Sequence, residues 1–332
     1  MKSLQDIAQK LAAQGTGILA ADESIGTLHK RFEKRGIPQA EEMHRKWREL
    51  LFVTPGIERG LSGVILFDET IRQAGSDGIL LRNTLLAKGI TFGIKVDKGA
   101  VGLTNFPDEK VTEGLDGLGT RLAEYAALGA TFTKWRGVFT VGKGLPTSEC
   151  IEANAYIFSQ FATLSQDAGL VPIVEPEVLL EGTHDMRACE VALGRVLQTV
   201  FASLKKYRVN LSSLLLKTSM ALPGKGLKEK AAPELVALST VRVLKAVVPR
   251  EVAGVVFLSG GQTPEEATKN LNATVLAGRK AKVPWPLTFS FSRALQDPVM
   301  DAWLGKDENV RAAQVIFQKR VEETARASEG KL

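Results

Sequence analysis

The chain has 332 residues, of which 44% are hydrophobic and 24% are charged, a composition typical of a folded globular protein. Its net charge of +6 suits acidic ligands, but the lysines and arginines are interspersed with acids and form no basic run, which argues against a nucleic-acid-binding protein. No run of about 18 apolar residues is present, so the sequence predicts no membrane span and no membrane partner.

The N-terminal stretch 1–15 is amphipathic and lacks the apolar core and cleavage pattern of a secretory signal. Cys150 and Cys189 lie in helical patterns, which is typical of reduced, buried thiols in a cytoplasmic protein. The three histidines are scattered without ligand spacing, so we expect no metal site. These histidines are His29, His44 and His184.

Short apolar runs rich in β-forming residues recur along the chain and alternate with segments of helical periodicity. The helical segments include 118–129, 233–248 and a helix that starts after Thr263, where threonine suits the N-cap and Pro264 the first turn. We expect strands at 17–22, 63–69, 91–98, 132–138, 170–177, 213–220, 254–261 and 286–293.

Eight strand–helix units without a change in composition predict the α/β fold class and a single TIM (β/α)8 barrel over residues 1–332. A doubly wound open sheet is the alternative, but eight units favour closure. Residues 307–332 are expected to form an exposed amphipathic helix, over 307–327, followed by a short polar tail.

Charged side chains gather at the C-terminal ends of the predicted strands, where barrel enzymes place their chemistry. Contact with water would also make strand ends polar, but it does not explain lysines that alternate with carboxylates from strand to strand. A site that binds a dianionic substrate and moves protons does explain this pattern. Residues two apart on a strand share a face, which pairs Lys95 with Asp97, Lys134 with Arg136, and Glu175 with Glu177.

Lys217 directly follows three leucines, 214–216, in the sixth predicted strand. Desolvation and neighbouring cations would lower the pKa of this lysine, and a neutral amine can form a Schiff base with a carbonyl group. Alternatively, Lys217 is a buried cation paired with Glu175. The residues alone leave both interpretations open.

Ten motifs stand in the order and approximate spacing seen in class I fructose-1,6-bisphosphate aldolases, and the chain resembles that family from about residue 7 to residue 320. Ten motifs in register are far more specific than any one of them. They are GILAADESIGTLHKRF (17–32), GVILFDET (63–70), GIKVDKG (93–99), GLDGL (114–118), KWR (134–136), VPIVEPE (171–177), LLLK (214–217), FLSGGQ (257–262), NLNA (270–273) and LTFSFSRALQ (287–296).

The resemblance implies reversible cleavage of fructose 1,6-bisphosphate to dihydroxyacetone phosphate and glyceraldehyde 3-phosphate, without metal or cofactor. It implies that Lys217 forms the Schiff base, and that Glu175 is the general acid/base with Glu177 as its electrostatic partner. It also implies that Asp22 is the base on the C4 hydroxyl and that Lys134 assists near that centre.

The phosphate of the substrate's C6 end is expected after the first strand. Ser24, Thr27 and Arg31 resemble this phosphate site in the family. Lys95 and Arg136 resemble the charged wall beside it.

The C1 phosphate is expected after the last two strands, which agrees with the usual phosphate position in barrels. Ser259, Gly260 and Arg293 resemble that site. The Ser259-Gly260-Gly261 turn offers N–H groups that can approach an anion, and an arginine can hold a phosphate with two donors. Ser292 stands where many family members have glycine. A serine keeps the backbone N–H but limits the conformations open to the backbone at this position.

Family members from animals and plants end in a tyrosine implicated in proton transfer at the carbanion carbon, whereas this sequence ends at Lys331-Leu332. We expect C–C cleavage to be retained and enamine protonation to be slower or to use another group. The tyrosines here are Tyr125, Tyr156 and Tyr207.

Two alternatives remain beside this function. One is the same chemistry with sedoheptulose 1,7-bisphosphate or fructose 1-phosphate as preferred substrate. The other is a non-catalytic binding scaffold, against which the complete catalytic set argues. The resemblance also implies a homo-oligomer, a tetramer in many family members.

Overall fold

The computed structural model describes residues 3–228 and 230–332. Eight strands close into a barrel in the order β1-β10-β9-β8-β7-β6-β3-β2, and neighbouring strands pair in parallel. Each strand overlaps one predicted range, so the (β/α)8 barrel is confirmed and the open-sheet alternative is wrong. The strands are β1 (Gly17–Ala21), β2 (Leu61–Leu66), β3 (Thr91–Lys95), β6 (Phe132–Phe139), β7 (Val171–Val178), β8 (Leu215–Thr218), β9 (Gly254–Phe257) and β10 (Leu287–Phe291).

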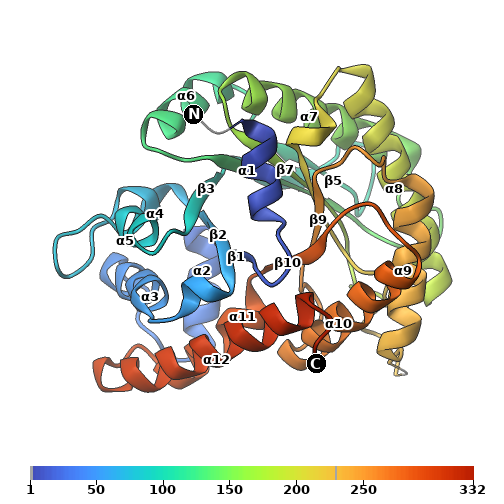
Figure 1. Ribbon diagram of the computed structural model, residues 1–332. Helices are drawn as coiled ribbons and strands as arrows, with labels where there is room; N and C mark the ends of the chain where they lie inside the picture. Colours follow the sequence, from blue (N-terminus) through green and yellow to red (C-terminus); the bar gives the residue numbers. More distant parts are fainter. Residues whose placement is uncertain (1–2, 229) are drawn as a thin grey trace.

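Helices surround the barrel (Figure 1). The predicted segments 118–129 and 233–248 form α6 and α9, and α10 begins after an N-cap at Thr263, whose side chain accepts from the Glu266 N–H. The helices are α1 (Leu4–Leu11), α2 (Ile25–Glu33), α3 (Glu41–Val53), α4 (Asp68–Arg72), α5 (Leu81–Ala87), α6 (Leu118–Ala127), α7 (Ser148–Asp167), α8 (Met186–Lys206), α9 (Pro233–Val247), α10 (Pro264–Lys280), α11 (Arg293–Trp303) and α12 (Val310–Ser328), with short 3-10 turns η1 (Ile57–Arg59), η2 (Leu211–Ser213) and η3 (Asp307–Asn309).

The interior of the barrel has two layers, because alternate side chains of each strand point inward. An apolar layer lies toward the N-terminal ends of the strands, and a charged layer lies two residues further along four of them. The apolar layer comprises Ile18, Ala20, Ile65, Phe132, Val171, Ile173, Leu215 and Val256. The charged layer comprises Asp22, Lys134, Glu175 and Lys217, all of them buried.

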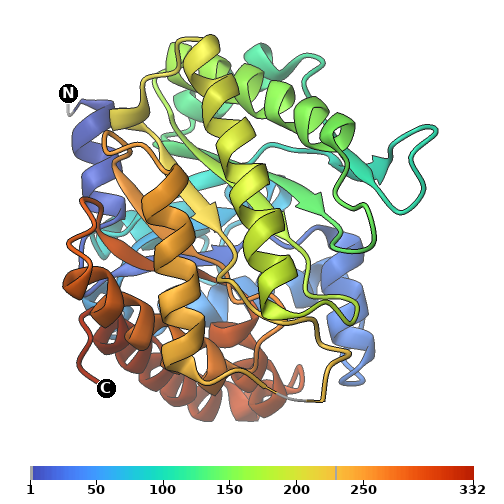
Figure 2. The same ribbon diagram turned by 90° about the vertical axis from the view of Figure 1, so that its right-hand side faces the viewer.

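Helix α1 closes the barrel beneath the apolar layer. Its residues Ala8 and Leu11, and Ala12 at its C-terminal end, belong to the same buried cluster as that layer. The helix approaches so closely that a Cβ added at Gly254 would overlap the Cβ of Ala12. In Figure 2, α1 lies at the left and the strand arrows point away from it. Within the described residues, α1 therefore covers the N-terminal end of the barrel, and a pocket opens at the opposite end.

A two-stranded antiparallel hairpin follows β3 and was not predicted from the sequence. It pairs β4 (Gly99–Gly102) with β5 (Lys110–Glu113), and its teal loop projects at the right in Figure 2. The Thr112 hydroxyl donates to the Arg136 carbonyl at 2.8 Å, which fixes the hairpin to β6. The hairpin therefore stands at the open end of the barrel.

The C-terminal segment differs in part from its prediction. Residues 307–309 form η3, and α12 then runs through Ser328, so the segment 327–332 begins inside the helix. The helix is not exposed on all sides, because Phe317 and Val321 are buried. Ser328, expected in a polar tail, is also buried and its hydroxyl accepts from the Gly15 N–H at 3.1 Å.

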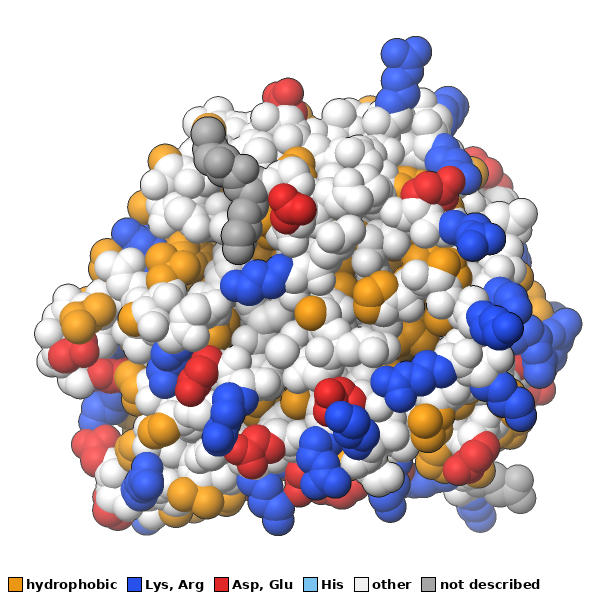
Figure 3. Space-filling model, viewed as in Figure 1, with side chains coloured by type: hydrophobic (Ala, Val, Ile, Leu, Met, Phe, Trp, Pro, Cys, Tyr) orange, Lys and Arg blue, Asp and Glu red, His pale blue; other side chains and the backbone are white. Residues whose placement is uncertain are grey.

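Cys150 and Cys189 are free and buried, as predicted. No helix in residues 3–228 and 230–332 combines the length and apolar character that crossing a membrane requires. Figure 3 shows Lys and Arg side chains interspersed with Asp and Glu on the face that carries α1.

Candidate active site

A pocket of about 470 Å³ opens at the C-terminal ends of the strands. Thirteen of the fifteen predicted site residues line it, although they come from seven strands and the segments that follow them. Ser24 and Gly261 are not among its lining residues. The thirteen are Asp22, Thr27, Arg31, Lys95, Lys134, Arg136, Glu175, Glu177, Lys217, Ser259, Gly260, Ser292 and Arg293.

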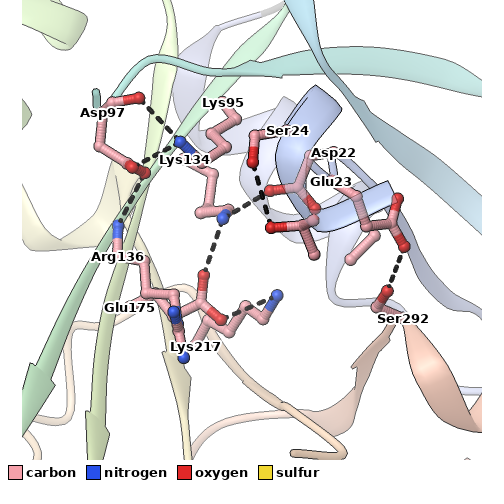
Figure 4. A network of polar contacts seen from close by, with 12 residues as sticks. Asp22, Glu23, Ser24, Lys95, Asp97, Lys134, Arg136, Glu175, Lys217 and Ser292 are labelled. Atoms are coloured by element: carbon pink, nitrogen blue, oxygen red, sulfur yellow. Dashed lines mark hydrogen bonds and ion pairs between the residues drawn. The ribbon is translucent and has the colours of Figure 1, made fainter. Parts of the chain in front are cut away.

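The charged layer forms a chain of ion pairs at the floor of this pocket (Figure 4). The Lys134 Nζ lies 2.5 Å from the Asp22 Oδ2 and 3.2 Å from the Glu175 Oε2. The other Glu175 oxygen lies 3.0 Å from the Lys217 Nζ. In this state Lys217 is thus paired with Glu175, which is the second of the two arrangements left open by the sequence. At this distance the Glu175 carboxylate can accept a proton from the Lys217 amino group.

Burial and charge oppose each other in the charged layer. Burial alone raises the pKa of Asp22, but the charges of Lys134 and Lys217 outweigh it and lower that pKa to about 2. Burial likewise raises the pKa of Glu175, and Lys134 and Lys217 bring it below its ordinary value. Burial alone lowers the pKa of Lys134, whereas Asp22 and Glu175 raise it above its ordinary value. Asp22 and Glu175 are therefore ionised at neutral pH, and Lys134 is a cation.

Two further ion pairs line the wall of the pocket. The Lys95 Nζ donates to the Asp97 Oδ1 at 2.5 Å, which agrees with the predicted shared face of these residues. The Arg136 Nε donates to the Glu177 Oε2 at 2.5 Å and so links β6 to β7. Lys95 and Arg136 thus stand in the wall of one cavity, each paired with its own carboxylate.

One end of the pocket is built by the loops after β9 and β10. Ser259 and Gly260 face Ser292 and Arg293, which begin α11. The Ser259 hydroxyl accepts from the Ala294 N–H at 3.4 Å, so the two loops are in contact. A Cβ added at Gly260 would come within 2.9 Å of the Glu177 Oε1, so a larger residue here would require that carboxylate to move. Backbone N–H groups and an arginine at a helix start form a typical anion site.

The other end is built by α2. Thr27 and Arg31 both line the pocket. Ser24 is the N-cap of α2 and does not line it, and its hydroxyl lies 3.1 Å from the Thr27 hydroxyl. Arg31 is already engaged, because its guanidinium pairs with Glu23 and lies 2.9 Å from the Asp297 Oδ1. The charge of the arginine at this end of the pocket is therefore shared with two acids.

Glu23 is a site residue that the sequence analysis missed. It follows Asp22, lines the pocket, and its carboxylate pairs with Arg31 and with the Arg48 Nη2 at 2.8 Å. The Ser292 hydroxyl also donates to Glu23, at 2.7 Å. Burial raises the pKa of Glu23, and the two arginines outweigh burial and lower it. Glu23 thus ties α2 and α3 to the start of α11.

Lys34, Arg35, Ser290 and Asp297 also line the pocket and were not predicted. Ser290 lies two residues before Ser292 on one face of β10, a spacing that would have identified it. Lys34 lies seven residues after Thr27, so a helical face drawn from Thr27 through Arg31 would have reached it. Asp297 has no such signal, because its position depends on how α11 packs beside α2.

The histidines are less scattered than expected. The His29 and His44 rings meet through their Nε2 atoms at 2.9 Å, and the His44 Nδ1 lies 3.1 Å from the Glu69 Oε1. These three residues lie outside the pocket lining, as does His184. Among the described residues, no group of three or more His, Cys, Asp or Glu side chains has the arrangement of a metal site.

A closed parallel barrel with buried lysines and carboxylates at the open ends of its strands defines an enzyme of the (β/α)8 type. The family model described as "Fructose-bisphosphate aldolase class-I" matches residues 3–332. The chain belongs to the class I fructose-bisphosphate aldolase family, whose members are carbon–carbon lyases.

Similar proteins cover 96% to 100% of the chain. A probable fructose-bisphosphate aldolase class 1 of Xanthomonas campestris pv. campestris is 46% identical over 100% of this chain and 98% of that protein. The cytosolic fructose-bisphosphate aldolase 6 of Arabidopsis thaliana is 47% identical over 96% of this chain and 88% of its own. The solved aldolase of Plasmodium falciparum, in complex with TRAP and a small-molecule inhibitor, is 43% identical, with a TM-score of 0.96 over 99% of this chain and 94% of that one.

Proposed function

We propose that this protein cleaves fructose 1,6-bisphosphate reversibly to dihydroxyacetone phosphate and glyceraldehyde 3-phosphate through a Schiff base on Lys217. The observation that carries the proposal is the contact of 3.0 Å between the buried Lys217 Nζ and the Glu175 carboxylate, at the floor of a pocket rich in cations. The Lys217 amine is the nucleophile, and the Glu175 carboxylate beside it accepts and returns the proton.

Schiff-base formation begins with a proton transfer from the Lys217 ammonium to Glu175, which leaves a neutral amine and a carboxylic acid. The amine adds to the C2 carbonyl of the substrate, and the proton that it loses passes to the carbonyl oxygen, giving a carbinolamine. Glu175 then returns its proton to the departing hydroxyl group, so that water leaves and an iminium forms. Glu175 is well suited to this role, because it begins ionised.

Cleavage needs a base on the C4 hydroxyl and an electron sink at C2. Asp22 is the base: it takes the hydroxyl proton while the C3–C4 bond breaks and its electrons flow to the iminium, giving an enamine and an aldehyde. Lys134 bridges Asp22 and Glu175, so it holds both carboxylates in place during the reaction. Glu177 holds Arg136 in the pocket wall.

The two phosphates occupy the two ends of the pocket. The C1 phosphate lies against Ser259, Gly260, Ser292 and Arg293, where α11 begins. The C6 phosphate lies toward Thr27 and Arg31 on α2, with Ser24 behind Thr27. No metal or cofactor takes part in these steps.

The Schiff base is tested by trapping. The protein is mixed with dihydroxyacetone phosphate in EDTA, borohydride is added, and the intact mass and peptide map are recorded. We expect one triose adduct, on Lys217. Lys217→Met is the control that should not be labelled, and an adduct on Lys134 or no adduct at all would contradict the proposal.

We further propose that the enzyme acts in the cytoplasm, in glycolysis and gluconeogenesis, as a homotetramer. The Arabidopsis relatives that are named cytosolic support the compartment. The tetramer rests on the family resemblance, and light scattering of the purified protein measures it directly.

A further inference from the structure

The cations of the pocket differ in whether their charge is already balanced. Eight lysine and arginine side chains line it, and six of them form ion pairs with carboxylates. Within residues 3–228 and 230–332, Lys34 and Arg293 have no carboxylate partner. The six paired cations are Arg31, Arg35, Lys95, Lys134, Arg136 and Lys217.

The two unpaired cations belong to the two ends of the pocket. Arg293 begins α11, and Lys34 ends α2 as its C-cap residue. A sugar bisphosphate carries two dianionic groups, and a cation without a partner gains most from binding one, since no existing ion pair has to break. From this charge balance we infer that Lys34 is a specificity-determining residue that binds the second phosphate of the substrate. The inference rests on the proposed function and extends it to this end of the pocket.

The helix geometry brings Lys34 to the same place as the other residues of this end. Thr27, Arg31 and Lys34 are spaced four and three residues apart, so they lie on one face of α2, and all three line the pocket. Side chains on a helix lean toward its N-terminus, so a lysine at position 34 has the length to reach back toward Arg31 and Thr27.

Arg31 itself is held by its surroundings. Its guanidinium pairs with Glu23, contacts the Gln296 Oε1 at 3.3 Å and lies 2.9 Å from Asp297. Arg35 is likewise paired, with Asp301 at 2.6 Å. Arg31 therefore positions this end of the pocket, whereas the exposed side chain of Lys34 is free to turn onto a phosphate.

The test compares a bisphosphate with a monophosphate that has the same carbon chain. Hexitol 1,6-bisphosphate and hexitol 1-phosphate lack the carbonyl group and cannot react, so calorimetry measures their Kd values without turnover. In Lys34→Met, we expect the preference for the bisphosphate, taken as the ratio of the two Kd values, to fall about five- to tenfold. Lys34→Arg should restore most of it.

Lys30→Met is the matched control, because Lys30 lies on the same helix and is exposed but does not line the pocket. We expect its ratio to stay within twofold of the unmodified protein. An unchanged ratio in Lys34→Met, or an equal fall in Lys30→Met, would overturn the inference even if borohydride traps an adduct on Lys217. A fall in Lys34→Met alone, without any adduct on Lys217, would uphold the inference and contradict the proposed chemistry.

Discussion

The apolar layer and the charged layer of the barrel interior share strands, but different interactions hold them together: apolar packing in the first and ion pairs in the second. On β8, Leu215 and Lys217 are separated by one residue, point the same way and are both buried. Leu215 packs in a cluster that excludes water. Lys217 instead forms an ion pair, with its Nζ 3.0 Å from a Glu175 carboxylate oxygen.

The difference shows that burial alone does not decide whether a residue contributes to the stability of the fold or to its chemistry. Burying an apolar side chain stabilises the fold in proportion to its area, whereas a buried ion pair offsets a large desolvation cost and adds little net stability. The charged layer is therefore kept for chemistry, and the apolar layer with α1 beneath it provides the rigid, dry base on which that chemistry depends. Substitutions in the two layers should separate activity from stability.

The largest effect on activity is expected for Lys217→Met. Loss of the nucleophile should lower kcat by about 10⁴-fold or more. Stability should change little, because Glu175 keeps Lys134 as a partner at 3.2 Å and the methionine fills the same space. Turnover assays and urea unfolding measure both, and a variant that keeps substantial turnover would contradict the assignment of Lys217.

Leu215→Ala is the matched change in the apolar layer. Here the free energy of unfolding should fall by about 2–5 kcal/mol, since a fully buried side chain is replaced by a cavity. The folded fraction should keep its kcat within a few fold. If instead the activity of the folded protein disappeared while stability was retained, the division of roles between the two layers would be wrong.

Lys134→Met should affect both properties. It leaves Asp22 without its nearest cation and removes one of the two partners of Glu175, so we expect a loss of about 3–5 kcal/mol in unfolding free energy. The rate should fall by about 10²-fold or more, because the base on C4 loses its orienting group. Adding Asp22→Asn to this variant should recover part of the stability but none of the activity, and a double variant less stable than Lys134→Met would argue against the pairing.

Much of the charged layer could be predicted from the sequence, because residues two apart on a strand lie on the same face. Two-residue spacing placed Lys134 and Glu175 on inward faces, and the barrel rule placed both at the open end. The partners across strands could not be derived in this way. The stagger of β6 against β7, which aligns Arg136 with Glu175, depends on the closed barrel.

Other features escaped the sequence because they arise from packing between distant elements. Glu23 looked like an ordinary acid after a strand, and its contacts come from α2, α3 and α11. The helical pattern of residues 4–11 showed an amphipathic helix but not that it would seal the barrel. The hairpin of β4 and β5 lies in a segment with little apolar alternation.

Acid should weaken the charged layer selectively. The folded-state pKa of Asp22, about 2, lies below its ordinary value of 3.8, so the ionised form stabilises the fold above that ordinary value. This contribution, about 2 kcal/mol, is lost as the pH falls from about 4 to about 2. Unfolding free energy measured across this range should fall less steeply in Asp22→Asn than in the unmodified protein. Equal slopes would show that Asp22 has no depressed pKa.

The smallest effect on the reaction rate is expected for Gly254→Ala, which also tests most sharply how α1 seals the N-terminal end of the barrel. The added Cβ would overlap Ala12 at the end of α1, so the helix must shift, at about 1–3 kcal/mol of unfolding free energy. Gly119→Ala is the control: nothing lies within 4 Å of its added Cβ, and alanine in α6 should leave stability equal or raise it by up to about 1 kcal/mol. The rate of the folded Gly254→Ala protein should change by less than twofold if α1 acts only as a seal. A larger fall in kcat, with Gly119→Ala unaffected, would mean that a shift of α1 displaces Lys217 through the apolar layer. The two layers would then be mechanically coupled.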